Sequence, residues 1–184
     1  MPIQTPICDF GQKAIPFELK STDNKILSLN DIKGENGTLI MFICNHCPYV
    51  KAVTKEIVED CNELKKIGIN SVAICANDAE NYPEDSFDNM IKFAKANQFE
   101  FPYLVDETQE IAKTYDAVCT PDFFGYNKNL ELQYRGRLRE LKNLIPVREG
   151  ESDLLKAMKQ ISETGKGPES QIPSAGCSIK WKNN

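Results

Sequence analysis

Two predominantly apolar runs, separated by one amphipathic segment, constrain the fold of this chain more than any other feature. Residues 37–43 (GTLIMFI) and 69–76 (INSVAICA) have the length and composition of strands that are buried on both faces of a sheet. Between them, Val50, Val53 and Ile57 recur at steps of three and four residues, which is the period of a helix with one apolar face. The order strand, helix, strand predicts two parallel strands joined by a helical crossover.

The remaining segments extend this pattern with further helices and with antiparallel strands. We expect hairpins over residues 17–34 and 122–136, a strand over 102–106, and helices over 84–98, 107–117 and 151–164. Asp106 and Gln109 have the spacing of a capping-box variant at the start of the second of these helices. Parallel pairings followed by antiparallel ones predict an α/β fold, with a central mixed sheet flanked by helices.

The domain organisation follows from the absence of any internal repeat or linker in the sequence. We expect one domain over residues 1–184, made of an N-terminal extension that carries the first hairpin (1–35), a core (36–165) and an irregular C-terminal tail (166–184). In open sheets of this kind, sites form beyond the carboxyl ends of the strands. The segment directly after residue 43 is therefore the first place to look for chemistry.

Composition and charge exclude several classes of function. The net charge of −5 argues against nucleic acid as a partner, because phosphate binding needs clustered Lys and Arg. No apolar run approaches the roughly 20 residues that a membrane-spanning helix needs, so we expect no membrane partner. The first ten residues lack the basic and apolar regions of a secretory signal. These features predict a cytoplasmic protein.

Cysteine spacing gives the strongest chemical signal. The chain contains seven cysteines, namely Cys8, Cys44, Cys47, Cys61, Cys75, Cys119 and Cys177. An odd number without an export signal does not indicate a disulfide framework. The close pair Cys44 and Cys47 is therefore the exception that needs an explanation.

The Cys-x-x-Cys segment has the features of a redox-active pair. Pro48 is compatible with the first turn of a helix, where its missing N–H removes no helical bond, so we expect the helix to begin around residues 44–47 with both sulfurs on one face. A helix start favours the thiolate, which is the reactive form of cysteine. His46 is a candidate for tuning Cys44, and a hydrogen bond from the Cys47 thiol is another. A metal site is not expected, because tetrahedral zinc takes four ligands and His46 is the only histidine.

The other thiols are expected to be mainly structural. Cys61 lies on the apolar stripe of the predicted helix and Cys75 in a predicted strand, so both are assigned to the core. Cys119 is either a core residue or an additional thiol near the pair. Cys177 either packs under the tail or serves as a resolving or partner-linking thiol.

Three segments together resemble a known family. They are the entry at residues 17–34 (FELKSTDNKILSLNDIKG), the CNHC motif between a strand and a helix, and VCTPDFF at residues 118–124. The chain resembles the AhpC/TSA–TlpA branch of thioredoxin-like proteins over nearly its whole length. The resemblance implies a thioredoxin fold in which Pro121 is a cis-proline that faces the Cys-x-x-Cys, with Thr120 and Pro121 holding a substrate chain.

The chain also departs from the pattern of this family. Ile43 replaces the Trp that commonly precedes the first cysteine. Thr38 occupies the strand position of the buried carboxylate that thioredoxin-like enzymes use as a proton acceptor. Cys47 followed by Pro48 is similar to a peroxiredoxin's peroxidatic cysteine, with Cys44 where that family has Thr, but no peroxiredoxin-like arginine is evident.

We therefore expect a thiol–disulfide oxidoreductase that acts in redox homeostasis or antioxidant defence. In this hypothesis Cys44 attacks a substrate disulfide or oxidised thiol and Cys47 resolves the mixed disulfide. No cofactor is required, and electrons come from a thiol donor such as a thioredoxin system. Two alternatives stay open at this point: a thiol peroxidase that uses Cys47, with Cys44 or Cys177 resolving, and a redox-inert binding module.

Overall fold

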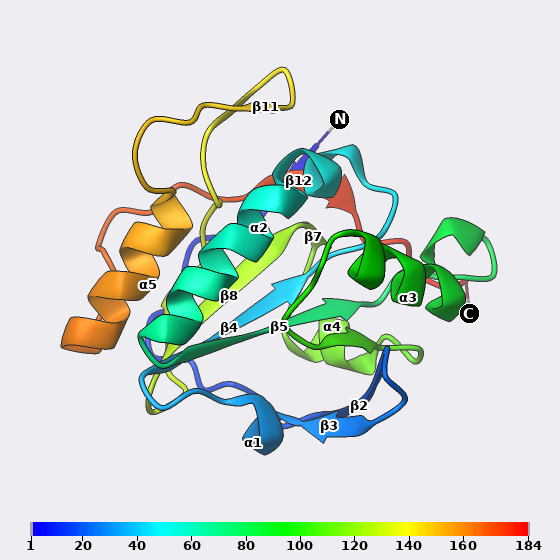
Figure 1. Cartoon of the computed structure of the whole chain (residues 1–184), viewed down its shortest axis with the longest axis horizontal. Helices are drawn as coiled ribbons and strands as arrows, with labels where there is room; N and C mark the ends of the chain where they lie inside the picture. Colours follow the sequence, from blue (N-terminus) through cyan, green and yellow to red (C-terminus); the bar gives the residue numbers. More distant parts are fainter. Residues whose placement is uncertain (1, 184) are drawn as a thin grey trace.

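A mixed sheet forms the centre of the molecule (Figure 1). The computed structural model describes residues 2–183, and over these residues the sheet has seven strands in the order β3-β2-β6-β5-β4-β8-β9. The strands are β2 (Glu18–Ser21), β3 (Ile26–Ser28), β4 (Gly37–Phe42), β5 (Ile69–Cys75), β6 (Tyr103–Val105), β8 (Asp122–Asn127) and β9 (Leu132–Tyr134). The parallel pairs β4–β5 and β5–β6 and the antiparallel pairs β2–β3 and β8–β9 confirm the predicted topology.

Helices cover both faces of this sheet. They are α1 (Leu29–Ile32), α2 (Pro48–Lys66), α3 (Phe87–Ala96), α4 (Glu110–Thr114) and α5 (Asp153–Thr164), with a 3-10 turn at Pro83–Asp85. Residues of α2, α3 and α5 belong to one apolar cluster, and residues of α1 and α4 belong to the other. The β4 strand supplies both clusters, because alternate side chains of a strand point to opposite faces: Leu39 and Met41 face α2, whereas Ile40 and Phe42 face the opposite side.

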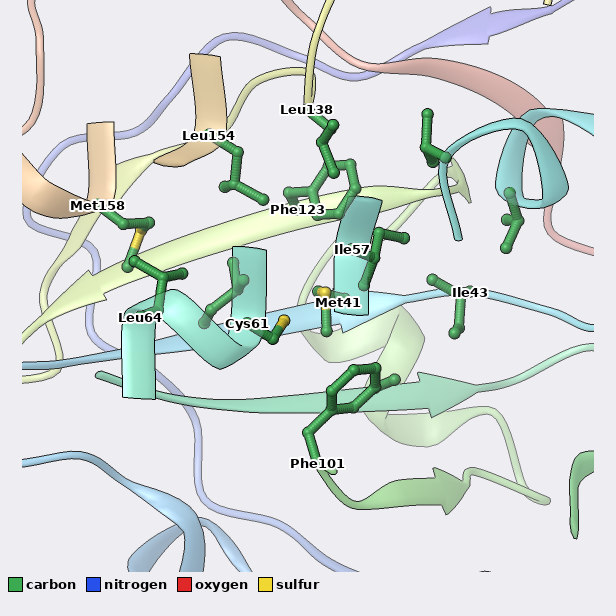
Figure 2. Packing of buried hydrophobic residues seen from close by; sticks show 14 of the residues in the cluster. Met41, Ile43, Ile57, Cys61, Leu64, Phe101, Phe123, Leu138, Leu154 and Met158 are labelled. Atoms are coloured by element: carbon green, nitrogen blue, oxygen red, sulfur yellow. The ribbon is translucent and has the colours of Figure 1, made fainter. Parts of the chain in front are cut away.

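Close packing of the α2 side explains the sequence period of this helix (Figure 2). Ile57, Cys61 and Leu64 point toward the sheet, and Leu154 and Met158 of α5 pack beside them. The predicted assignment of Cys61 and Cys75 to the core is confirmed, since both are at most 5% exposed. Burial raises the pKa of each of these thiols to about 12, so they stay protonated.

Most of the C-terminal tail is irregular, as expected, but part of it joins a sheet. It contains strand β12 (Ala175–Ser178), which lies between β1 (Ile3–Gln4) and β7 (Cys119–Thr120) in a small antiparallel sheet. The strand is short and not strongly apolar, so its sequence carries little signal. A second unpredicted hairpin joins β10 (Leu141–Lys142) to β11 (Ile145–Pro146).

The start of α4 also differs from the prediction. The helix is shorter than expected, and the predicted capping box is wrong. Gln109 adopts a left-handed conformation and its amide nitrogen donates to the carbonyl oxygen of Ala76. The Asp106 carboxylate accepts the N–H groups of Ile111 and Ala112 instead. Contacts outside the helix therefore decide its start, and local spacing does not reveal them.

One buried ion pair fastens a loop to α2. The Arg139 guanidinium lies 2.6 Å from the Glu56 carboxylate, and both residues are at most 7% exposed. Arg139 also donates to the carbonyl oxygens of Val147 and Gly150. The segment that carries β10 and β11 is thus held against the middle of α2. Between residues 2 and 183, no helix has the length and apolar character needed to cross a membrane.

Candidate functional site

The Cys-x-x-Cys segment lies directly beyond the carboxyl end of β4. Cys47 is the N-cap residue of α2 and Pro48 is the first helical residue, as Pro48 predicted. Cys44 precedes the helix, so the expected reason for the approach of the two sulfurs, a shared helical face, is wrong. The loop between strand and helix brings them together instead. Both cysteines are at most 1% exposed.

The Thr120–Pro121 peptide forms the opposite wall of the site. This bond is cis, as the resemblance implied. The Thr120 hydroxyl oxygen lies 3.5 Å from the Cys44 sulfur, and the Thr120 carbonyl oxygen accepts a hydrogen bond from the Cys47 thiol at 3.3 Å. A buried ion pair between Asp122 and Arg135, at 2.9 Å, supports the segment from behind.

A buried carboxylate that sequence reasoning missed lies beside Cys44. Asp85 follows β5 in the 3-10 turn and its side chain is fully buried. It accepts hydrogen bonds from the backbone N–H of Asn45 at 2.7 Å and from the Asn77 amide at 2.8 Å. The Tyr103 hydroxyl in turn donates to the Asn45 side chain at 2.7 Å. The family position at Thr38 holds no acid, but Asp85 supplies one from the 3-10 turn that follows the neighbouring strand β5.

His46 contacts this carboxylate. Its Nδ1 atom lies 2.6 Å from a carboxylate oxygen of Asp85, and its ring stacks on Tyr82 with centroids 6.1 Å apart. The His46 side chain is 27% exposed, whereas that of Asp85 is fully buried. The two residues thus form a connection from the surroundings of Cys44 to the surface.

The two sulfurs have opposite electrostatic surroundings. The pKa of Cys47 is lowered, chiefly by a hydrogen bond from the Cys44 thiol, and further by the Cys177 thiol, by Thr120 and by the N–H of Val50 at the start of α2. The pKa of Cys44 is raised by the adjoining Cys47 sulfur, by burial and by the negative charge of Asp85. Sequence reasoning placed the tuned thiolate at Cys44, whereas these surroundings favour Cys47.

The site also offers donors of the kind that bind metals. The Cys44 sulfur, a ring nitrogen of His46 and a carboxylate oxygen of Asp85 all lie within 4.8 Å of one another. These are three of the ligand types that zinc takes in tetrahedral sites. That no metal is needed stays a prediction.

The additional thiols divide between the core and the site. Cys119 is buried, and its thiol faces the carbonyl oxygen of Pro121 at 3.7 Å. Cys177 is partly exposed and lies on β12, opposite Thr120 in the strand register. Cys8 is partly exposed and packs against the apolar cluster on the opposite face of the sheet from Cys44 and Cys47.

A hollow of about 210 Å³ borders the same wall. Tyr49, Pro121, Phe123 and Ala175 are among the residues that line it. Phe123 is fully buried and also contributes to the core on the α2 side.

Comparisons with known proteins place this chain in a family. The model of the AhpC/TSA family matches residues 10–140. The chain belongs to the AhpC/TSA family. Within it, the thioredoxin-like fold that the resemblance implied is confirmed. A comparison with curated proteins finds no significant match.

Two solved structures are similar to this AhpC/TSA-family chain over its whole length. One is an uncharacterized conserved protein from Geobacillus kaustophilus, with 43% identity, a TM-score of 0.91, and coverage of 100% of this chain and 98% of the other. The second is a hypothetical protein from Sinorhizobium meliloti 1021, with 30% identity, a TM-score of 0.91 and full coverage of both chains. A more distant structure is Peroxidoxin BcpB from Mycobacterium tuberculosis, with 15% identity, a TM-score of 0.56, and coverage of 67% of this chain and 81% of that one. At this identity the likeness shows the fold alone.

Proposed function

We propose that the protein is a thiol–disulfide oxidoreductase whose reacting groups are Cys44 and Cys47. The observation that carries the proposal is the arrangement of two buried sulfurs, one favouring the thiolate and one the thiol, against the Thr120–Pro121 peptide. A thiolate at Cys47 is the nucleophile that disulfide exchange needs, and the Cys44 thiol beside it can close the pair.

The proposed reaction uses the cysteines in the reverse order of the sequence-based hypothesis. The Cys47 thiolate attacks one sulfur of a disulfide, so that a bond from Cys47 to that sulfur forms and the second sulfur leaves as a thiol. Cys44 then loses its proton and attacks Cys47. The Cys44–Cys47 disulfide forms, the first sulfur leaves, and two electrons have passed to the substrate.

Asp85 and His46 are the proposed route for the Cys44 proton. Asp85 is close enough to repel a negative charge on Cys44, and its carboxylate touches His46, which reaches the surface. A carboxylate that accepts the proton during attack acts as a general base. In this proposal the pair takes the role of the buried carboxylate whose strand position is occupied by Thr38.

A thiol peroxidase is the second candidate, because Cys47 favours the thiolate and sits at a helix start before Pro48. The nearby arginine that would assist peroxide chemistry is engaged elsewhere. Arg135 donates to both carboxylate oxygens of Asp122 and to the backbone of Asp116. Disulfide exchange is therefore the better supported reaction.

The two candidates differ in which cysteine is indispensable. Reduction of insulin disulfides with a dithiol donor should fall to the background rate in both Cys44→Ser and Cys47→Ser, and should be unchanged in Cys8→Ser. Peroxide consumption that is fast, and that survives Cys44→Ser but not Cys47→Ser, would favour the peroxidase. Full insulin reduction by Cys44→Ser would refute the proposed role of the pair.

A further inference from the structure

Strand β12 lies across the redox site at a position where it covers Cys47. Its Cys177 pairs with Thr120 and its Ser178 pairs with Cys119, so the strand runs antiparallel along the cis-peptide segment. The same strand packs against α2, and Figure 1 shows β12 beside the start of this helix. The full burial of Cys47 is thus compatible with a cover made by the tail of the chain itself.

The approach of β12 to the cis-peptide is so close that it needs glycine. A Cβ atom at Gly176 would lie 2.0 Å from the carbonyl oxygen of Thr120, a separation that real atoms do not adopt. The next residue along the strand is Cys177. The close contact between Gly176 and Thr120 therefore determines how near the side chain of Cys177 lies to the redox site.

Anchors on both sides hold the strand in this register. The Ser174 hydroxyl donates to the carbonyl oxygen of Pro121 at 2.7 Å, and Thr5 and Ser174 exchange hydrogen bonds at the edge strand. Beyond the strand, the backbone N–H of Lys180 donates to the Asn77 side chain at 3.0 Å. Because Asn77 also donates to Asp85, the tail and the buried carboxylate share one network.

The Cys177 sulfur faces the same helix start as Cys47. It interacts with the Cys47 sulfur and with the backbone N–H of Tyr49, and it packs against the apolar cluster that contains Cys44 and Cys47. Cys47 thus lies between two other thiols, Cys44 on the loop and Cys177 on the tail. Of the three, Cys177 alone is partly exposed.

We propose that Cys177 is a third redox thiol, which carries electrons between external thiols and the buried Cys44–Cys47 pair through a Cys47–Cys177 disulfide. This inference rests on the proposed function and adds the residue that gives the pair access to its thiol donor. The donor class is a low-molecular-weight thiol or a dithiol protein that can reach the partly exposed sulfur.

The relay reduces the Cys44–Cys47 disulfide in three thiol–disulfide exchanges. First, Cys177 loses its proton and attacks Cys47 in the Cys44–Cys47 disulfide; the Cys47–Cys177 bond forms, and Cys44 leaves and takes up a proton. Second, an external thiolate attacks Cys177, and Cys47 leaves as a thiolate, which its surroundings favour. Third, a second external thiolate attacks the external sulfur of this mixed disulfide and frees Cys177. Two external thiols become one disulfide, and the pair gains two electrons.

The direct test is the disulfide that forms when Cys44 is absent. The reduced Cys44→Ser variant is treated with diamide in the presence of a chelator, quenched with acid, alkylated, and mapped by peptide mass spectrometry. The relay predicts that the Cys47–Cys177 disulfide dominates. Disulfides that contain Cys8, the other partly exposed thiol, measure non-specific oxidation. Cys47–Cys177 at or below the level of the Cys8 disulfides would overturn the proposal.

A rate measurement tests the relay in the complete pair. Oxidised wild-type protein and oxidised Cys177→Ser are reduced with glutathione, and the loss of the Cys44–Cys47 disulfide is followed over time. We expect a slowing of at least about tenfold in Cys177→Ser and no change in Cys8→Ser. Equal rates in Cys177→Ser and the wild type would refute the relay. If the wild type forms no Cys44–Cys47 disulfide at all, the proposed function fails, whereas the Cys44→Ser result still decides on the third thiol.

Gly176→Ala provides a second variant in which every thiol is retained. The added methyl group pushes β12 away from Thr120, so the reduction rate should fall as in Cys177→Ser while the Cys44–Cys47 disulfide still forms. Near-ultraviolet circular dichroism confirms that the variant is folded. A folded Gly176→Ala with the wild-type rate would contradict the role of the strand in placing Cys177.

Discussion

Single residues around the Cys-x-x-Cys assign different tasks to two chemically identical side chains. Cys47 has the N-cap position of α2, where N–H groups without helical partners favour a negative charge. Cys44 faces the buried carboxylate of Asp85, which disfavours a negative charge there. The Cys-x-x-Cys spacing alone does not reveal this difference, because the charge of Asp85 comes from the turn that follows β5.

The first prediction concerns the titration of Cys47. Because its surroundings lower the Cys47 pKa, the thiolate absorbance of the reduced protein at 240 nm should show a transition well below the ordinary value of about 8.5. Cys44→Ala removes the hydrogen bond from the Cys44 thiol and should raise this midpoint. Cys44→Ser keeps a donor and should raise it less. A midpoint that is the same in all three proteins would contradict the assignment.

The second prediction concerns Asp85 as the proton acceptor. Asp85→Asn should slow the formation of the Cys44–Cys47 disulfide from a Cys47 mixed disulfide by about 10²-fold near pH 7. Without this base, the Cys44 thiol can still react after it has lost its proton to water, which becomes more frequent as the pH rises. The rate of this variant should therefore recover at higher pH. The measurement is stopped-flow release of a chromogenic thiol from Cys47. Asp78→Asn is the matched control, because Asp78 is on the same loop but its carboxylate accepts hydrogen bonds from Glu80 and Asn81. A small, pH-independent loss would indicate a purely structural role.

The helices and strands that position the site come from segments far apart in the sequence. The β4 strand and α2 place the two cysteines, and the segment from β7 to β8 places the cis-peptide opposite them. The segment that carries β10 and β11 is fastened to α2 by the Arg139–Glu56 pair. A buried polar contact thus connects this segment to the helix that begins at the redox site.

The third prediction compares two ion pairs on that helix. Glu56→Gln leaves the buried Arg139 without a counter-charge and should lower the free energy of unfolding by about 3–5 kcal/mol. Glu59→Gln removes a pair with Arg148 in which both side chains are about half exposed, and should cost less than about 1 kcal/mol. Urea denaturation of both variants gives the comparison. Equal losses would show that burial of the Glu56 pair has no special importance.

Elements with a strong hydrophobic period were predictable, and elements fixed by distant contacts were not. The runs that became β4 and β5 and the stripe of α2 follow from residue patterns, as does the helix start at Pro48. Strand β12 could not be predicted, because the residues on either side of it are held by hydrogen bonds to Thr5, Pro121 and Asn77. These three partners lie far away in the sequence. Asp85 was missed for the same reason: nothing in its local sequence indicates that Asn45 and His46 will surround it.

The stability of the whole molecule depends in part on the protonation of a buried carboxyl group away from the site. Asp60 of α2 is 5% exposed and accepts a hydrogen bond from the Ser152 hydroxyl at 2.6 Å, which joins α2 to the start of α5. Burial raises the Asp60 pKa to about 6. The folded state therefore holds this proton more tightly than the unfolded state, so the contribution of Asp60 to stability is lost as pH rises toward and through 6.

The fourth prediction follows from this linkage. Asp60→Asn does not titrate, so its stability relative to the wild type should improve between pH 4 and pH 7.5, by about 2–3 kcal/mol. Urea denaturation at the two pH values provides the measurement, and Glu59→Gln, a more exposed neighbour, should show no comparable pH dependence. A stability difference that does not change with pH would show that the Asp60 carboxyl titrates equally in both states.

The claim that Cys44 and Cys47 form a reversible dithiol–disulfide couple is tested most directly by a redox titration. The wild-type protein is equilibrated in dithiol buffers that span about −120 to −300 mV, the range of protein dithiol couples, then acid-quenched and mapped by mass spectrometry. We predict one two-electron transition in which the Cys44–Cys47 disulfide appears, and its loss in Cys44→Ser and Cys47→Ser but not in Cys8→Ser. A pair that stays reduced over the whole range, or full disulfide-reductase activity in Cys44→Ser, would contradict the claim.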